Sequence, residues 1–146
     1  MSVGWMRDPK RFGERLAITV HHPEAYEILR PMVRPKPGDW MKGGCCVLAK
    51  ALQQYLGFGE LWMVIINRGV GPRDGEIVHV VLKVDNSYFD AEGCHSKSGL
   101  IKAWKQWYSQ SGISLRPFDA AAARREGLSC PNPQPIVRYL ERRMSR

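Results

Sequence analysis

Three residues with reactive side chains occur in a fixed order in the middle of this 146-residue chain. Cys45 follows two glycines at the start of a segment with helical periodicity, His79 lies in a β-rich segment, and Asp90 lies in the next one. Such a chain can bring the three side chains together only if the helix that begins at the cysteine packs on a sheet that holds the other two. This requirement constrains the fold more than composition does.

Composition is that of one ordinary globular domain over residues 1–146. Hydrophobic residues make up 44% and charged residues 25% of the chain, which is typical of globular proteins long enough to bury one core. No apolar run approaches the roughly 18 residues of a membrane span, and Met1–Asp8 lacks the apolar region of a signal peptide. We therefore expect a cytoplasmic protein without a membrane partner.

The four cysteines do not predict a disulfide framework or a metal site. Cys45 and Cys46 are adjacent, which is rare for framework disulfides, and Cys130, next to Pro131, is predicted to have no role. There is no Cys-x-x-Cys pair and no histidine pair at positions i and i+4. No metal and no organic cofactor is expected.

The formal net charge is +8, and most of the basic residues lie near the two ends of the chain. A solvated basic surface explains this pattern, and contact with nucleic acid or an acidic protein is the alternative. The basic residues in question are Arg7, Lys10, Arg11, Arg15, Arg116, Arg124, Arg125, Arg138, Arg142, Arg143 and Arg146.

Hydrophobic periodicity and turn residues predict an α+β fold. A helix of about 13 residues opens at Gly43-Gly44 and ends at Gly57, with an apolar stripe formed by Leu48, Leu52, Tyr55 and Leu56. We expect this helix to pack on a small antiparallel sheet, with further helices at both ends. The predicted strands are 61–66, which is expected to be central, 77–84 and 87–91. The other predicted helices are 10–16, 23–29, 100–108, 119–126 and 136–144. Loops are expected at 31–42 and 69–75, and an extended connector at 131–135.

The turn at Asp85-Asn86 decides whether the histidine and the aspartate can meet. A two-residue turn pairs Val84 with Ser87 and puts His79 and Asp90 on one face as diagonal neighbours, about 7–8 Å apart. A three-residue loop puts them on opposite faces. The two-residue register also places Glu92 opposite His79, as an alternative orienting carboxylate.

These residue types suit nucleophilic catalysis, although each also has an ordinary structural interpretation. A helix N-terminus stabilises a thiolate, a histidine can take the thiol proton, and a carboxylate can orient the imidazole. Taken alone, a buried cysteine is more often a small hydrophobe and a strand histidine is more often structural. Cys46 competes with Cys45 as the nucleophile, from about 100° around the helix.

The remaining candidates are given structural interpretations. Cys94 and His95 are predicted to be an exposed pair in a loop, and His21-His22 to lie on the surface. The aromatic set Trp104, Trp107 and Tyr108 is interpreted as core rather than as a base-stacking platform.

The segment Gly43-Gly44-Cys45-x-x-x-Ala49-x-Ala51-Leu52, followed by His79-Val80-Val81 and by Tyr88-Phe89-Asp90-Ala91-x-Gly93, resembles the core of small papain-fold proteins of phages and bacteria. The order cysteine, histidine, aspartate, with the last two on successive strands, is similar to that of transglutaminase-like enzymes. The resemblance covers about residues 40–93. It implies a papain-like or transglutaminase-like domain in the cytoplasm of a bacterial or phage-infected cell.

Carried over residue by residue, the resemblance makes Cys45 the nucleophile, His79 the general base and later acid, and Asp90 the orienting group. The backbone N–H of Cys45 would form one half of an oxyanion hole. Papain-like enzymes usually supply the other half from a glutamine upstream, but no Gln or Asn occurs between Met1 and Cys45. The indole N–H of Trp40 is the candidate that replaces it.

Three functions follow, in this order. The first is a thiol-dependent acyl-bond enzyme, such as a peptidase, amidase, deamidase or acyl-transferase, acting on a peptide or protein substrate. The second is a non-catalytic phage-type protein that binds and inhibits a host protein. Nucleic-acid binding through the basic termini ranks third, because no helix-turn-helix, RNA-recognition or zinc-finger signature is present.

Overall fold

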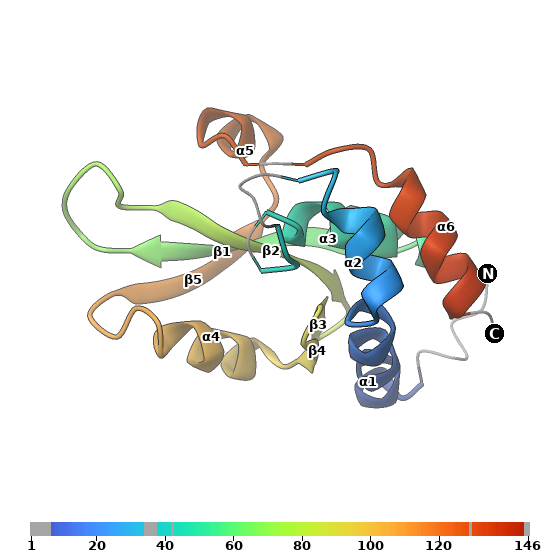
Figure 1. The fold of residues 1–146 in the computed structure, drawn as a ribbon. Helices are drawn as coiled ribbons and strands as arrows, with labels where there is room; N and C mark the ends of the chain where they lie inside the picture. The colour runs from blue at the N-terminus through green and yellow to red at the C-terminus, as the bar shows by residue number, and fades with distance from the viewer. Residues whose placement is uncertain (1–6, 34–37, 42, 129, 145–146) are drawn as a thin grey trace.

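The computed structural model describes residues 7–33, 38–41, 43–128 and 130–144 (Figure 1). The elements follow one another as α1 (Pro9–Val20), α2 (Pro23–Leu29), α3 (Cys45–Leu56), β1 (Glu60–Asn67), β2 (Glu76–Val84), β3 (Ser87–Asp90), β4 (Gly93–His95), α4 (Lys97–Lys105), β5 (Gly112–Pro117), α5 (Ala120–Arg125) and α6 (Gln134–Arg143). Part of the predicted loop 31–42, at 34–37 and 42, lies outside the described residues.

The five strands form one antiparallel sheet in the order β4-β3-β2-β1-β5. The predicted α+β class is therefore confirmed, and β1 is central as expected. The sequence interpretation missed the two edge strands. β4 has only three residues, and β5 carries a short alternation of Ile113 and Leu115 with polar residues that ends at Pro117, a residue typical of edge strands.

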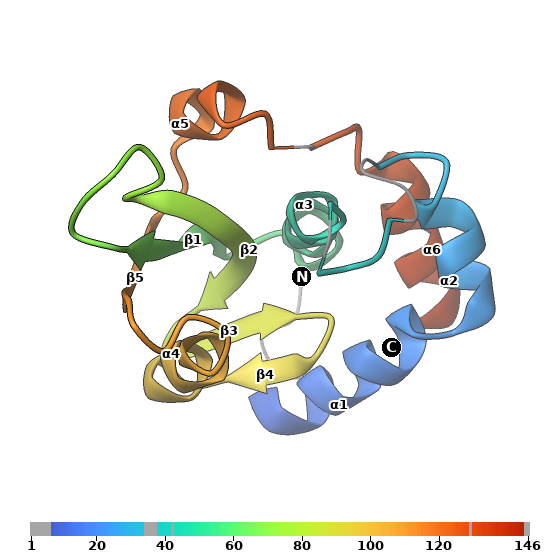
Figure 2. The same cartoon turned by 60° about the vertical axis from the view of Figure 1, so that its left-hand side comes forward.

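Helix α3 lies against one face of the sheet and is part of the largest hydrophobic cluster. Figure 2 views it almost along its axis, between β2 and the pair of helices α2 and α6. Leu48, Leu52 and Leu56 are buried, as their spacing predicts, in a cluster that includes Leu82 of β2 and Phe89 of β3. The helix ends at Gly57, whose φ of 82° is the left-handed conformation of a C-terminal glycine.

Helix α4 covers the opposite face of the sheet. Its residues Leu100 and Trp104 pack with Val64 of β1, Val81 of β2 and Tyr88 of β3. The site can therefore draw side chains from two layers: α3 on one side of β2 and α4 on the other.

The terminal helices complete the core around α3. In α1, Gly13 packs so closely on β4 that an added Cβ would lie 2.4 Å from the backbone nitrogen of Cys94. In α6, Arg142 and Arg143 both form ion pairs with Glu24 of α2. Two of the basic residues near the C-terminus thus hold helices together. Helix α6 also begins earlier than predicted, at Gln134, with Pro135 in its first turn, where proline is tolerated.

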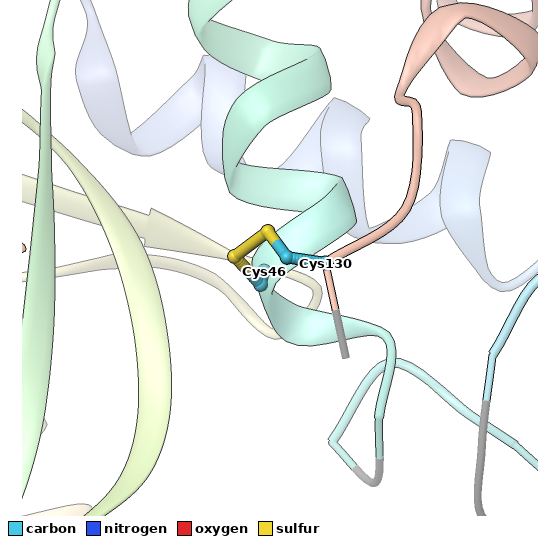
Figure 3. The surroundings of a disulfide bond; sticks show 2 residues. All are labelled: Cys46 and Cys130. Atoms are coloured by element: carbon cyan, nitrogen blue, oxygen red, sulfur yellow. A yellow bond between two sulfur atoms is a disulfide. The ribbon is translucent and has the colours of Figure 1, made fainter. Parts of the chain in front are cut away.

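The prediction that the cysteines form no disulfide is wrong. Cys46, the second residue of α3, is bonded to Cys130 in the connector between α5 and α6 (Figure 3). Their Cα atoms lie 5.2 Å apart, within the normal range for a disulfide. The bond joins residues 84 positions apart in the sequence, a proximity that only the folded chain creates.

No helix in the described part of the chain is long and apolar enough to cross a membrane.

Candidate active site

The structure brings His79 and Asp90 into direct contact inside the protein. The imidazole Nε2 of His79 lies 2.8 Å from Oδ2 of Asp90, and the ring is completely buried. The predicted two-residue turn creates this contact: Val84 pairs with Ser87 and Leu82 with Phe89. Asp85 has a φ of 53°, the positive value that such a tight hairpin turn requires.

A β-bulge in β2 sets the position of His79. Val64 of β1 pairs with His79, but the next residue, Ile65, pairs with Ile77, so Val78 is an extra residue in β2. Bulges bend a strand and change the direction of its side chains, and they are frequent beside functional sites. Here Val78 packs with Trp104 of α4, and the His79 ring lies 5.0 Å from the Trp104 ring. Val80, on the other face, packs against Cys45 and Cys46.

Cys45 lies at the first position of α3, next to the His79 ring. Gly44 precedes it and provides no side-chain cap, so the first-turn N–H groups of the helix have no side-chain partner from that residue. Gly44 is required for packing: an added Cβ would lie 2.6 Å from the carbonyl oxygen of Asp39. The exposed fraction of Cys45 is 5%, so the residue is buried but not completely enclosed.

The electrostatics of the pair favour a charged imidazolium and a charged carboxylate. Burial lowers the pKa of His79, but interactions with Asp90 and with the Cys45 sulfur outweigh burial and raise it from 6.5 to about 9. Burial raises the pKa of Asp90, but hydrogen bonds from His79 and His95 hold it well below its usual value.

One nitrogen of the His79 ring has no hydrogen-bond partner among the described residues. This atom, Nδ1, is buried, whereas Nε2 is engaged by Asp90. Buried ring nitrogens are normally satisfied, because an unpaired buried polar atom costs free energy. The Cys45 side chain interacts with this ring and raises its pKa, and Nδ1 is the nitrogen that Asp90 leaves open to such an interaction.

His95 is a further member of the site that the sequence analysis missed. It was predicted to be exposed in a loop, but it lies on β4 with its Nε2 2.9 Å from Oδ1 of Asp90. The backbone N–H of Glu92 donates to the same oxygen at 2.9 Å. Both oxygens of Asp90 are thereby occupied, and the carboxylate is fixed between two histidines. No sequence pattern identified the three-residue strand that carries His95.

Three alternative candidates for catalytic roles do not take part in the arrangement around His79. Cys46, the competing nucleophile, is held in the disulfide. Glu92, the alternative orienting carboxylate, is exposed and contacts His21 rather than His79. The indole N–H of Trp40 donates to the carbonyl oxygen of Val20 at 2.7 Å, so Trp40 is not the second oxyanion donor.

The remaining sequence candidates have structural roles or lie on the surface. His21 bonds to the Tyr26 hydroxyl and to the backbone carbonyl of Ala91, and His22 caps the N-terminus of α2. Trp107 was interpreted as core, but it is 77% exposed. No group of three or more His, Cys, Asp or Glu side chains suited to a metal ion occurs within the described ranges.

No family model, no curated protein and no solved structure matches this chain.

Proposed function

We propose that this protein is a thiol-dependent enzyme that acts on an acyl bond, on a papain-like or transglutaminase-like core. Cys45 is the nucleophile, His79 is the general base and later the general acid, and Asp90 orients the imidazole. The observation that carries the proposal is the buried His79 ring, with one nitrogen on Asp90, the other without a hydrogen-bond partner among the described residues, and the Cys45 side chain interacting with the ring.

The arrangement supports a two-step acyl transfer. His79 takes the thiol proton, and the Cys45 thiolate attacks the carbonyl carbon, so that a C–S bond forms. As the tetrahedral intermediate collapses, the bond to the leaving amine or alcohol breaks and His79 gives it the proton. His79 then removes a proton from water or from an acceptor amine, which attacks the thioester. The C–S bond breaks and the thiolate is regenerated.

Backbone groups at the start of α3 suit the charge that develops during attack. The N–H of Cys45 lies in the uncapped first turn, where the helix dipole favours negative charge. A donor in that position stabilises the thiolate before attack and the oxyanion after it.

A purely structural role for these residues explains the site less well. A structural histidine in a protein core is expected to have both ring nitrogens bonded, whereas within the described chain only Nε2 of His79 has a hydrogen bond of normal geometry and the Cys45 side chain interacts with the ring. A structural carboxylate does not need two histidines, yet Asp90 contacts both His79 and His95. The first feature is expected of a histidine that keeps one nitrogen free for proton transfer. The second is expected of a carboxylate that holds such a histidine in a fixed orientation.

The proposal is tested by acylation with p-nitrophenyl acetate, an activated ester that needs little substrate recognition. We expect a burst of p-nitrophenol and an acetyl group on Cys45, located by peptide mass spectrometry. In His79→Ala the burst should slow by about 10²-fold or more, because general base catalysis is lost. Wild-type turnover by Cys45→Ala, or acetylation of Cys94 alone, would overturn the proposal.

A further inference from the structure

A groove of about 760 Å³ runs beside the candidate active site, between the end of α4 and the start of β2. Trp104, Trp107 and Tyr108 form one wall, and Ile77 and Val78 form the other. In Figure 1, α4 lies below the β1–β2 hairpin, with β5 drawn between them. The volume lies within the range of small-ligand sites.

The groove is lined by close chain neighbours of the reactive residues. Gly43, two residues before Cys45, lines it, and so does Val78, the residue before His79. Trp104 contacts the His79 ring and also borders a second groove of about 390 Å³, which reaches Asp90. The larger groove therefore lies beside the chain positions that carry Cys45 and His79.

Among the described residues that line the groove, three are aromatic and the two charged ones, Arg73 and Glu76, are paired with each other. The rings of Trp104 and Tyr108 are nearly parallel, at 19°, with centroids 6.4 Å apart. Arg73, at the rim, is paired with Glu76. A charged ligand group would have to compete with this ion pair, whereas an uncharged aromatic ring gains apolar burial and ring contacts.

Trp107 adds an exposed aromatic surface to this groove. It is 77% exposed, one of three large hydrophobic residues so exposed in the described chain; Ile18 and Val70 are the others. Exposed tryptophans beside a pocket are typical anchors for binding, because they offer a large apolar area at little entropic cost.

We propose that this groove binds an uncharged aromatic side chain of the substrate, next to the acyl group that is transferred to Cys45. The inference rests on the proposed function, because it names the substrate class of the same site. The substrate is accordingly a peptide or peptide-like acyl compound with a phenylalanine-type residue at the scissile bond.

The test compares two active-site probes, the chloromethyl ketones of N-acetyl-phenylalanine and N-acetyl-alanine, whose chloride the Cys45 sulfur displaces. Their second-order rate constants are measured by mass spectrometry on the intact protein. We expect the phenylalanine probe to react about 10- to 100-fold faster, from the apolar area that its ring buries. In Trp107→Ala this ratio should fall to a few-fold. Ile18→Ala, which removes an equally exposed side chain on α1, should keep the wild-type ratio.

The two proposals fail in different ways. Equal rates with both probes, or an unchanged ratio in Trp107→Ala, would overturn the aromatic groove while labelling of Cys45 still depends on His79. Labelling of Cys45 that is the same in His79→Ala as in the wild type would instead overturn the proposed function. A faster reaction of an aspartate or lysine probe than of the phenylalanine probe would also contradict the inferred substrate class.

Discussion

At the scale of single residues, the site depends on one buried imidazole held by one carboxylate. The sequence predicted that His79 and Asp90 meet if the turn at Asp85-Asn86 has two residues, because the register fixes the face of every side chain. The structure has that two-residue turn. The sequence did not predict His95. That residue reaches Asp90 because the chain reverses directly after Asp90, which pairs with Gly93, and a strand of three residues is too short to show alternation.

The charge on His79 predicts how stability depends on pH. Because its pKa is raised from 6.5 to about 9 in the folded state, the folded protein holds this proton more tightly than the unfolded chain does. The stabilisation is complete below pH 6.5 and is lost as the pH rises through about 9. The free energy of unfolding should therefore fall by on the order of 2 kcal/mol over this interval.

Urea unfolding at a series of pH values checks this prediction. His79→Asn is the matched variant, because it removes the titrating ring and keeps a polar group. Its free energy of unfolding should vary less between pH 6.5 and 9 than that of the wild type. An equal fall in both proteins would assign the pH dependence to other groups.

At the scale of elements, the start of α3 is the part on which the site depends most. The sequence predicted a helix that opens at Gly43-Gly44. The structure gives a reason for Gly44, because the space of a side chain there is filled by the carbonyl of Asp39. The contact is made by the loop before the helix, whose sequence has no periodic pattern that could have predicted it.

Replacing Gly44 with alanine is expected to destabilise the protein and displace the start of α3. The new Cβ would lie 2.6 Å from the Asp39 oxygen, and overpacking of this kind costs about 1–3 kcal/mol. Gly112→Ala is the control, since a Cβ there meets its nearest atom at 3.7 Å. The urea midpoints of the two variants are compared. Equal midpoints would show that Gly44 is not packed against Asp39 as described.

At the scale of the whole molecule, the disulfide connects the site to the C-terminal part of the chain. Cys46, beside the proposed nucleophile, is bonded to Cys130 in the connector between α5 and α6. The α+β class, the central β1 and most helices followed from local patterns in the sequence. The disulfide did not, because residues 84 positions apart meet only through tertiary packing. The edge strand β5 was missed for a related reason: its short apolar alternation becomes a strand only by pairing with β1.

Loss of the disulfide should lower global stability without removing the nucleophile. Cys130→Ser opens a long covalent loop, and such a change costs about 2–4 kcal/mol. Denaturant unfolding of this variant, with Cys94→Ser as a control that leaves the disulfide intact, measures the effect. A midpoint equal to that of the wild type under non-reducing conditions would contradict a bond between these cysteines.

The most direct test of the central claim is the alkylation of the two free cysteines by iodoacetamide, followed by mass spectrometry across pH. Burial raises the pKa of Cys94, which makes it a slow internal reference. The account predicts that Cys45 is modified much faster than Cys94 at pH 6–7, and that His79→Ala removes this difference. Slow modification of Cys45, with a rate that His79→Ala does not change, would contradict an activated thiol and with it the proposed enzyme.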